Sequence, residues 1–127
     1  MERVTIPMRL PSCNEYINAC RSNRYVAAKL KKDVEAELQL YLRKLPKFKK
    51  PVTIKFIWVS KKDDRRDLDG ISFAKKFILD AMQECERITN DNRQNVVGFA
   101  DEFYYGPNYE VRLEIEEMKA YELKEER

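Results

Sequence analysis

The sequence contains no histidine, so carboxylates and lysines remain as the groups that could bind a metal ion or move a proton. Its three cysteines, Cys13, Cys20 and Cys85, have no CxxC or Cys/His spacing, which predicts reduced thiols rather than disulfides or a zinc site. No apolar run approaches the ~20 residues of a membrane-spanning helix. Residues 1–4 lack the apolar core of a signal peptide. We therefore expect a cytoplasmic protein with no membrane segment.

Length and charge restrict the kind of protein further. A chain of 127 residues, 43% hydrophobic and 37% charged, can bury one core, and we expect a single domain over residues 1–127. The net charge of +3 hides an uneven distribution: residues 21–50 carry ten basic and three acidic side chains, and residues 101–127 carry nine acidic and four basic ones. The basic segment could contact the phosphates of a nucleic acid or be the solvated face of a helix.

The first half of the chain predicts a strand, a helix and a second strand. Alternating apolar residues predict the first strand over residues 4–10, and Pro7 favours an edge position for it. A loop through Asn18 follows, and Ser22 and Asn23 are suited as N-caps of a long helix that ends at Pro46. β-Branched and aromatic residues predict the second strand over residues 52–59.

The second half predicts a helix and two strands. The helix covers residues 69–86, and the strands cover residues 96–105 and 109–115, with a turn between them. A charged tail, helical or frayed, begins at Lys119. The order β-α-β-α-β-β indicates the α/β class, with a small mixed β-sheet and flanking helices.

The most informative segment is Arg65-Arg66-Asp67-Leu68-Asp69-Gly70, between the second strand and the second helix. In an extended segment, residues two apart point to the same side, so Asp67 and Asp69 repel each other unless a cation or proton lies between them. Such oxygen ligands suit Mg²⁺ or Mn²⁺, and Asp91 in a later loop is a third candidate. Asp69 is equally suited as a helix N-cap, and Asp91 lies in ordinary turn chemistry, so these roles stay open.

A polar stripe is expected along the second helix. Ser72, Lys76 and Asp80 follow at i, i+4 and i+8, beside an apolar stripe. On a continuous helix Asp80 lies roughly 16 Å beyond Asp69, too far to share a metal ion. We expect Asp80 to form an ion pair with Lys76, which either positions the lysine or is a surface pair without function.

These residues together resemble the RusA-type Holliday junction resolvases of phages, prophages and bacteria. The family motif is Asp-x-Asp-Asn, then a helix with a lysine, then Asp-Ala-Leu, then an acid in the next loop. Here Asp67-Leu68-Asp69-Gly70, Lys76, Asp80-Ala81 and Asp91 stand at similar places. Residues 10–16 are similar to the family's first-strand end, and residues 98–103 to its phage branch in Gram-positive hosts. The resemblance thus covers most of the chain.

The resemblance implies a homodimeric endonuclease that depends on Mg²⁺, for which Mn²⁺ can substitute. It further implies binding to four-way junction DNA and resolution by paired symmetric nicks, in DNA recombination and repair. Carried over by position, Asp67, Asp69 and Asp91 match the catalytic, metal-binding carboxylates. Lys76 matches the essential lysine when the helix is aligned backward from Asp80.

The chain departs from the family motif at two positions. Gly70 stands where the motif has asparagine, which removes a side chain able to orient a neighbouring ligand. Lys76 follows Asp69 by seven residues rather than about four, an insertion of nearly one turn that adds roughly 4.5 Å of rise. Either Lys75 or Lys76 could therefore be the functional lysine.

The main hypothesis from the sequence is a metal-dependent, junction-resolving endonuclease. The residues expected to contact DNA are Lys61, Lys62, Arg65, Arg66 and Lys75. The aromatic candidates for a dimer interface are Trp58, Phe99, Phe103, Tyr104 and Tyr105. The alternatives are a catalytically inactive nucleic-acid-binding module and a phage structural or inhibitory protein whose acidic tail contacts a basic partner.

Overall fold

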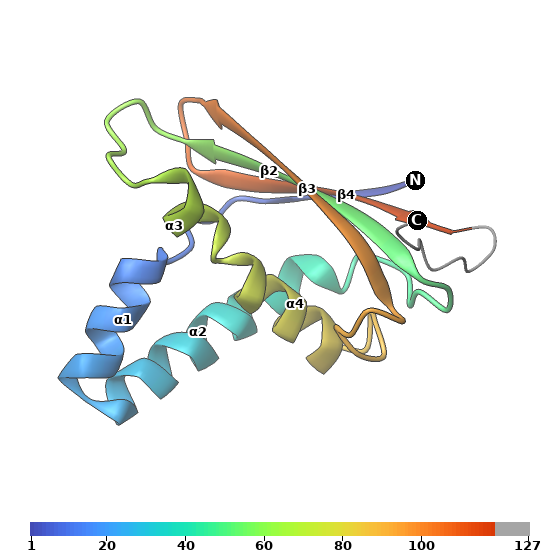
Figure 1. Cartoon of the computed structure of the whole chain (residues 1–127), viewed down its shortest axis with the longest axis horizontal. Coiled ribbons are helices and arrows are strands. Elements are labelled where there is room, and N and C mark those ends of the chain that lie inside the picture. Colours follow the sequence, from blue (N-terminus) through green and yellow to red (C-terminus); the bar gives the residue numbers. More distant parts are fainter. Residues whose placement is uncertain (119–127) are drawn as a thin grey trace, which may run out of the picture.

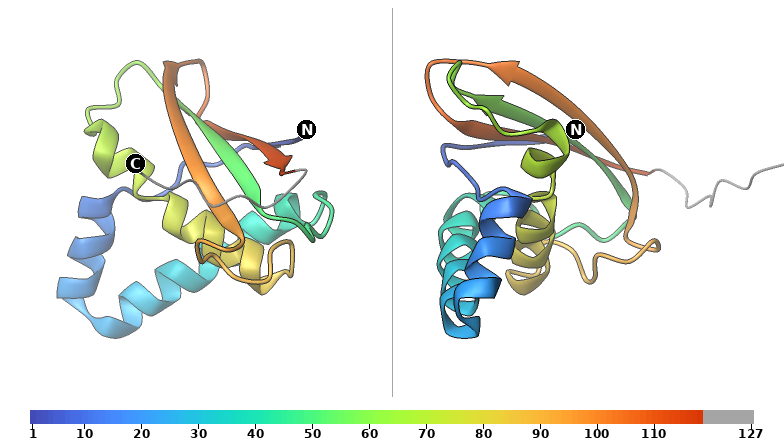
Figure 2. Two further views of the ribbon diagram at one scale, coloured as in Figure 1. Left: turned by 45° about the vertical axis from the view of Figure 1, so that its right-hand side comes forward. Right: turned by 60° about the vertical axis from the view of Figure 1, so that its left-hand side comes forward.

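The helices lie together on one face of a β-sheet in the computed structural model, which describes residues 1–118 (Figures 1 and 2). Along the chain the elements are β1 (Glu2–Ile6), α1 (Cys13–Ser22), α2 (Arg24–Leu42), β2 (Val52–Ser60), α3 (Leu68–Ser72), α4 (Lys75–Glu84), β3 (Val96–Tyr105) and β4 (Glu110–Glu117). The α/β class predicted from the sequence is confirmed. The predicted charged tail lies outside the described residues.

The sheet has four strands in the order β1-β4-β2-β3. Strand β2 is antiparallel to β4 and parallel to β3, and β1 is antiparallel to β4, so the sheet is mixed as expected. Strand β1 lies at an edge, as Pro7 indicated. The parallel pair requires a crossover connection, and α3 and α4 supply it. The acidic segment of the sequence is the start of this crossover.

Alternation along the strands explains why one face of the sheet is covered by helices. Val52, Ile54, Phe56 and Trp58 are buried on the face of β2 that meets the helices, and Val111, Leu113 and Ile115 of β4 lie beside them. The other face carries an ion-pair ladder across the strands. Its links join Arg3 to Glu114 (3.3 Å), Glu114 to Lys55 (3.9 Å) and Lys55 to Glu102 (3.3 Å). Charged pairs of this kind let that face stay in water.

The segment after β1 differs from the prediction. Strand β1 ends at Ile6 rather than at residue 10. Met8 and Leu10 are apolar because both are buried in the core, although neither belongs to the strand. The predicted loop through Asn18 is wrong, because helix α1 forms there. Ser12 and Glu15 make a reciprocal capping box at its start, with the Glu15 amide donating to Ser12 Oγ at 3.3 Å.

Of the two long helices that the sequence predicts, one is confirmed and the other is divided in two. Helix α2 is confirmed, and Asn23 caps it by accepting a hydrogen bond from the Tyr25 amide at 2.7 Å. The prediction of a single helix over residues 69–86 is wrong, because a turn at Phe73 and Ala74 divides it into α3 and α4. Tight i to i−3 bonds, such as the Lys76 amide to the Phe73 carbonyl at 3.0 Å, replace the α-helical pattern there. Ser72 and Lys76 therefore do not share one continuous helix face.

Two further expectations concern membranes and thiols. In the described part of the chain, no helix is both long and apolar enough to cross a membrane. Cys13, Cys20 and Cys85 are all free, in agreement with the prediction of thiols.

The turn between β3 and β4 depends on a small residue. A Cβ atom at Gly106 would lie 2.7 Å from Cγ1 of Val59, a buried residue of β2, whereas one at Gly98 would lie 3.6 Å from Cγ2 of Thr53. We predict that Gly106→Ala lowers the free energy of unfolding by about 1–3 kcal/mol through overpacking. Gly98→Ala is the matched control, and its free energy of unfolding should be higher than that of Gly106→Ala. Urea denaturation of the two variants measures the difference, and equal stabilities would contradict the prediction.

Candidate functional site

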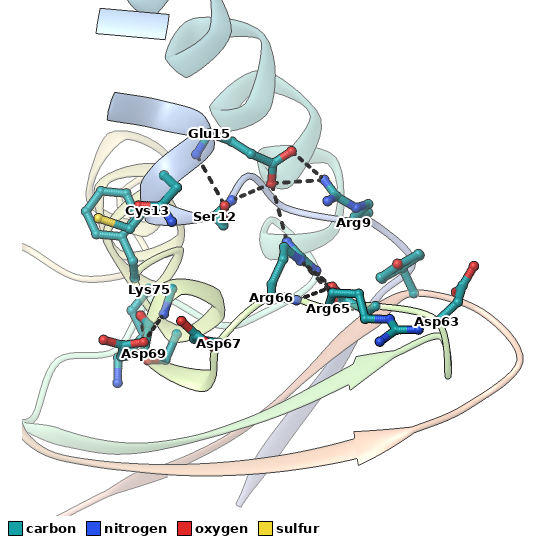
Figure 3. Close-up of a pocket in the computed structure, with 16 residues that line it drawn as sticks. Arg9, Ser12, Cys13, Glu15, Asp63, Arg65, Arg66, Asp67, Asp69 and Lys75 are labelled. Carbon is teal, nitrogen blue, oxygen red and sulfur yellow. Dashed lines mark hydrogen bonds and ion pairs between the residues drawn. The ribbon is translucent and has the colours of Figure 1, made fainter. Parts of the chain in front are cut away.

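A cleft of about 910 Å³ opens where the start of α1, the loop after β2 and helix α3 meet (Figure 3). The charged residues that line it are Arg9, Glu15, Asp63, Asp64, Arg65, Arg66, Asp67, Asp69 and Lys75. Gly70, Ser72 and Tyr109 contribute to its walls. The cleft thus contains most of the segment 65–70, on which the sequence analysis is centred. It also contains Arg9, Ser12 and Glu15 from the N-terminal part of the chain, which the sequence did not predict.

The loop between β2 and α3 is held by one buried ion pair. Arg66 donates from Nε to both carboxylate oxygens of Asp64 at 3.0 Å and from Nη2 to Oδ2 at 2.8 Å. Its Nη1 donates to the Leu10 carbonyl at 2.9 Å and lies 3.6 Å from Oε1 of Glu15. The Arg66 side chain is only 15% exposed and that of Asp64 only 4%. Arg66 therefore ties the loop to the start of α1, a positioning role that differs from the free DNA contact expected for it.

The two acids of the motif occupy the start of α3, and the N-cap position considered for Asp69 belongs to Asp67. Asp67 is the N-cap residue, in extended conformation, but its side chain makes no capping hydrogen bond. Asp69 lies in the first turn, where its Oδ1 accepts a hydrogen bond from the Gly70 amide at 2.9 Å. Within residues 1–118, no ion pair engages either carboxylate. Both line the cleft, and both face the positive end of a helix, which favours negative charge.

A second group of cations surrounds the ring of Tyr109. The guanidinium carbons of Arg9 and Arg66 lie 5.5 and 5.7 Å from the ring centroid, and Lys61 Nζ lies 5.9 Å from it. Arg9 also pairs with Glu15 at 3.1 Å. Lys61 was expected from its loop position, whereas Arg9 and Tyr109 were missed because they are far from the motif in sequence. Lys62 and Arg65 are exposed in the same loop, and Arg65 lines the cleft.

Glu15 belongs to this network as an ionised side chain. Burial by itself raises the pKa of Glu15, but hydrogen bonds from Ser12 and the charge of Arg9 outweigh burial and lower the pKa. The Ser12 amide donates to Oε1 of Glu15 at 2.9 Å. An ionised Glu15 can therefore hold both Arg9 and the start of α1 beside the cleft.

Asp91 and Lys76 lie in a different neighbourhood from Asp67 and Asp69. Lys76 Nζ is 3.3 Å from Oδ1 of Asp80 and 3.9 Å from Oδ2 of Asp91. Lys31 of α2 joins this group, 3.3 Å from Oδ2 of Asp80. The expected Asp80–Lys76 pair is thus present. None of these four residues lines the cleft, so the structure brings together two of the three expected metal ligands and leaves the third apart.

Lys75, the neighbour of Lys76, does line the cleft. Its ammonium group donates a hydrogen bond to the carboxylate of Asp101 on β3. Figure 3 places Lys75 at the same end of the cleft as Asp67 and Asp69. The helix break at Ala74 is the reason, because it makes Lys75 the first residue of α4 and directs the two lysines to different surroundings.

The donor set of the cleft suits a divalent cation in part. Arg66 pairs with Asp64, and Arg9 pairs with Glu15, so among the described residues the acids of the cleft without an ion pair are Asp63, Asp67 and Asp69. Of these, Asp67 and Asp69 lie together at the start of α3. Mg²⁺ is commonly held by one or two carboxylates, with water and substrate phosphate oxygens completing the shell. Among residues 1–118, however, no group of three or more Asp, Glu, Cys or His side chains is arranged to hold a metal ion. Asp67 and Asp69 could supply two such carboxylates, and Asp91 lies apart from them.

The sequence was compared with models of known protein families and with curated proteins, and nothing matches in either comparison. The residues of the site therefore carry the functional argument.

The Arg66–Asp64 pair predicts how stability depends on pH. Hydrogen bonds from Arg66 lower the pKa of Asp64 from 3.8 to about 2. The lowered pKa means that the pair stabilises the fold above the unfolded value of 3.8, and that this contribution is lost as the pH falls toward 2. It amounts to about 2 kcal/mol at neutral pH.

We predict that Asp64→Asn lowers the free energy of unfolding by at least this ~2 kcal/mol at pH 7 and flattens its decline below pH 4. Asp63→Asn, which changes an exposed acid next to it, is the matched control. Denaturant unfolding from pH 7 down to pH 2 gives both quantities. Identical pH profiles for Asp64→Asn and the unsubstituted protein would show that the pair does not stabilise the fold.

Proposed function

We propose that this protein is a Mg²⁺-dependent endonuclease that cuts four-way DNA junctions by paired nicks, with Mn²⁺ able to replace Mg²⁺. The observation that carries the proposal is the acidic pair of Asp67 and Asp69, which has no ion-pair partner among residues 1–118 and lies in a cleft bordered by cations. Carboxylates that hold a cation, beside side chains that attract phosphate, are what phosphodiester hydrolysis needs. The similarity of the motif to the RusA-type resolvases agrees with this chemistry and supplies the junction as substrate.

The residues of the chain would divide the work as follows. Asp67 and Asp69 hold the divalent ion, and their place at the start of α3 fixes both backbones. A bound Mg²⁺ supplies a more acidic water and stabilises the charge that builds on the phosphate. Arg9, Lys61 and Arg65 attract the flanking phosphates of the DNA arms without reading sequence. Arg66 positions the loop that carries Lys61, Arg65 and the start of the acidic pair.

Asp91 and Lys76 enter the proposal through the motif alone. Their present partners, each other and Asp80, leave them outside the cleft. In this proposal Asp91 is a third metal ligand because it stands where the motif has its later acid.

Two equivalent strands of a four-way junction must be cut, and one cleft reaches one strand. We therefore propose a homodimer related by a two-fold axis, acting in the cytoplasm. Among the aromatic residues that the sequence offered for an interface, Trp58 belongs to the core, whereas Tyr104 and Tyr105 stay exposed on the edge strand β3. These tyrosines and Phe99, which is half exposed on the same strand, are the candidates that remain available to a second copy.

A nucleic-acid-binding module without catalysis is the second candidate. Two observations favour it. Within residues 1–118, no group of three or more Asp, Glu, Cys or His side chains is arranged to hold a metal ion, and Gly70 stands in place of the motif's asparagine. The two candidates differ in one assay. Incubation of a labelled four-way junction with the protein in Mg²⁺ yields paired nicks from an endonuclease and only a bound complex from the module, and EDTA should abolish the nicks.

We predict that Asp67→Asn and Asp69→Asn each lower the cleavage rate by more than the ~10–100-fold typical of residues that merely orient a metal ligand. Junction binding should persist or tighten, because each substitution removes a negative charge near phosphate. The matched control is Asp33→Asn, which changes an acid on α2 that pairs with Lys29. Cleavage by Asp67→Asn at the rate of the control would rule out the assigned site.

We also predict that junction affinity falls steeply with salt. A protein that contacts 6–10 phosphates loses roughly 10³–10⁵ in affinity between 50 and 200 mM salt through counterion release. Light scattering should give twice the 15.2 kDa mass of the chain. Salt-insensitive binding by a protein that light scattering shows to be monomeric would contradict the proposal.

A further inference from the structure

Lys75 is the most constrained lysine beside the cleft. Its side chain is 21% exposed, and its ammonium group is bound to the carboxylate of Asp101. Two aromatic rings flank the same ammonium group, with Nζ 5.5 Å from the centroid of Phe56 and 5.2 Å from that of Phe99. Cation–π contacts of this kind hold a charge in place without removing its hydrogen-bond donors. Phe99, which is half exposed on β3, thus has a specific partner.

Asp101 is itself held from the protein interior. The indole Nε1 of Trp58, a residue that is 2% exposed, donates a hydrogen bond of 2.9 Å to Oδ1 of Asp101. The other carboxylate oxygen, Oδ2, accepts from Lys75. Trp58 stacks on Phe56, with ring centroids 5.7 Å apart and planes within 10° of parallel. The chain of contacts from Trp58 through Asp101 to Lys75 therefore runs from a rigid part of the core to the cleft.

Lys76 offers a contrast within the same helix turn. Its side chain is 59% exposed and pairs with Asp80 and Asp91. Successive residues of a helix point about 100° apart, because one turn takes 3.6 residues. The break at Ala74 starts α4 at Lys75, and this directs Lys75 to the cleft and Lys76 to the neighbouring acidic group.

We propose that Lys75 contacts the scissile phosphodiester in the cleft, and that Asp101 and Trp58 are the positioning residues that aim it there. The inference rests on the proposed endonuclease function. A lysine ammonium has three donors; Asp101 takes one and leaves the others for phosphate oxygens. Holding a flexible lysine in advance removes the need to order it during the reaction, which is how preorganised charges accelerate a reaction.

The adjacent lysines make a matched pair for the test. Single-turnover cleavage of a four-way junction is measured for Lys75→Ala and Lys76→Ala, with thermal melting as the check on folding. Removing a preorganised charge from a reacting phosphate typically costs about 10²–10³-fold in rate. We expect Lys75→Ala to lower the cleavage rate by about 100-fold. This loss should be at least roughly ten times larger than that of Lys76→Ala, for the same reason. A Lys76→Ala loss equal to or larger than that of Lys75→Ala overturns the inference.

Trp58→Phe and Asp101→Asn test the positioning residues. Asp101→Asn keeps the shape of the side chain, whereas Trp58→Phe removes the indole N–H donor together with part of the ring. Each should lower the single-turnover rate by about 10–100-fold, as residues that orient a functional group do, with junction binding in Ca²⁺ unchanged. If Trp58→Phe does not fold, Asp101→Asn decides. Rates within two-fold of the unsubstituted protein for a folded variant overturn the positioning role.

A labelling measurement gives a readout that does not depend on cleavage. Brief acetylation of the unsubstituted protein, followed by mass spectrometry, should label Lys76 more than Lys75, and Asp101→Asn should raise labelling of Lys75 without changing that of Lys76. Equal labelling of both lysines before substitution counts against the constraint on Lys75. Absence of any cleavage by the unsubstituted protein would overturn the proposed function instead, while the labelling result still decides whether Lys75 is held.

Discussion

The buried pair between Arg66 and Asp64 is the interaction on which the rest of the site depends. It closes the loop after β2 on itself and, through the Leu10 carbonyl, ties that loop to the start of α1. The pair also fixes the residue directly before Asp67, so the acidic pair begins from a rigid point. An arginine that looked like a DNA contact thus acts on the fold.

The topology explains why Asp67, Asp69 and Lys75 line one cleft and why Lys75 reaches Asp101 on β3. The parallel pairing of β2 and β3 requires a crossover, and α3 and α4 provide it with a break at Ala74. Asp67 and Asp69 begin the crossover, Lys75 begins its second helix, and Asp101 lies on the strand to which it leads. A continuous helix would have placed these groups differently, because Lys76 would then have followed Ser72 on the same face.

The sequence was sufficient for the class of fold, the edge position of β1 and helix α2. These features follow from local patterns, in which apolar residues repeat every two positions in a strand and every three to four positions in a helix. It failed at α1, although Ser12 and Glu15 carry the spacing of a capping box, because residues 11–14 are also typical of a turn. The Trp58–Asp101–Lys75 contacts and the cations around Tyr109 were beyond reach, since each joins segments that only the sheet brings together.

The central claim is that Asp67 and Asp69 hold a divalent ion in the cleft, and the most direct test is a crystal structure of the protein grown with Mn²⁺. Anomalous scattering identifies manganese without reference to activity. The account predicts an anomalous peak at about 2.0–2.2 Å from a carboxylate oxygen of each residue, the coordination distance expected for such small, oxygen-bound ions. A fully occupied manganese ion among Asp80 and Asp91, with the cleft empty, would contradict it.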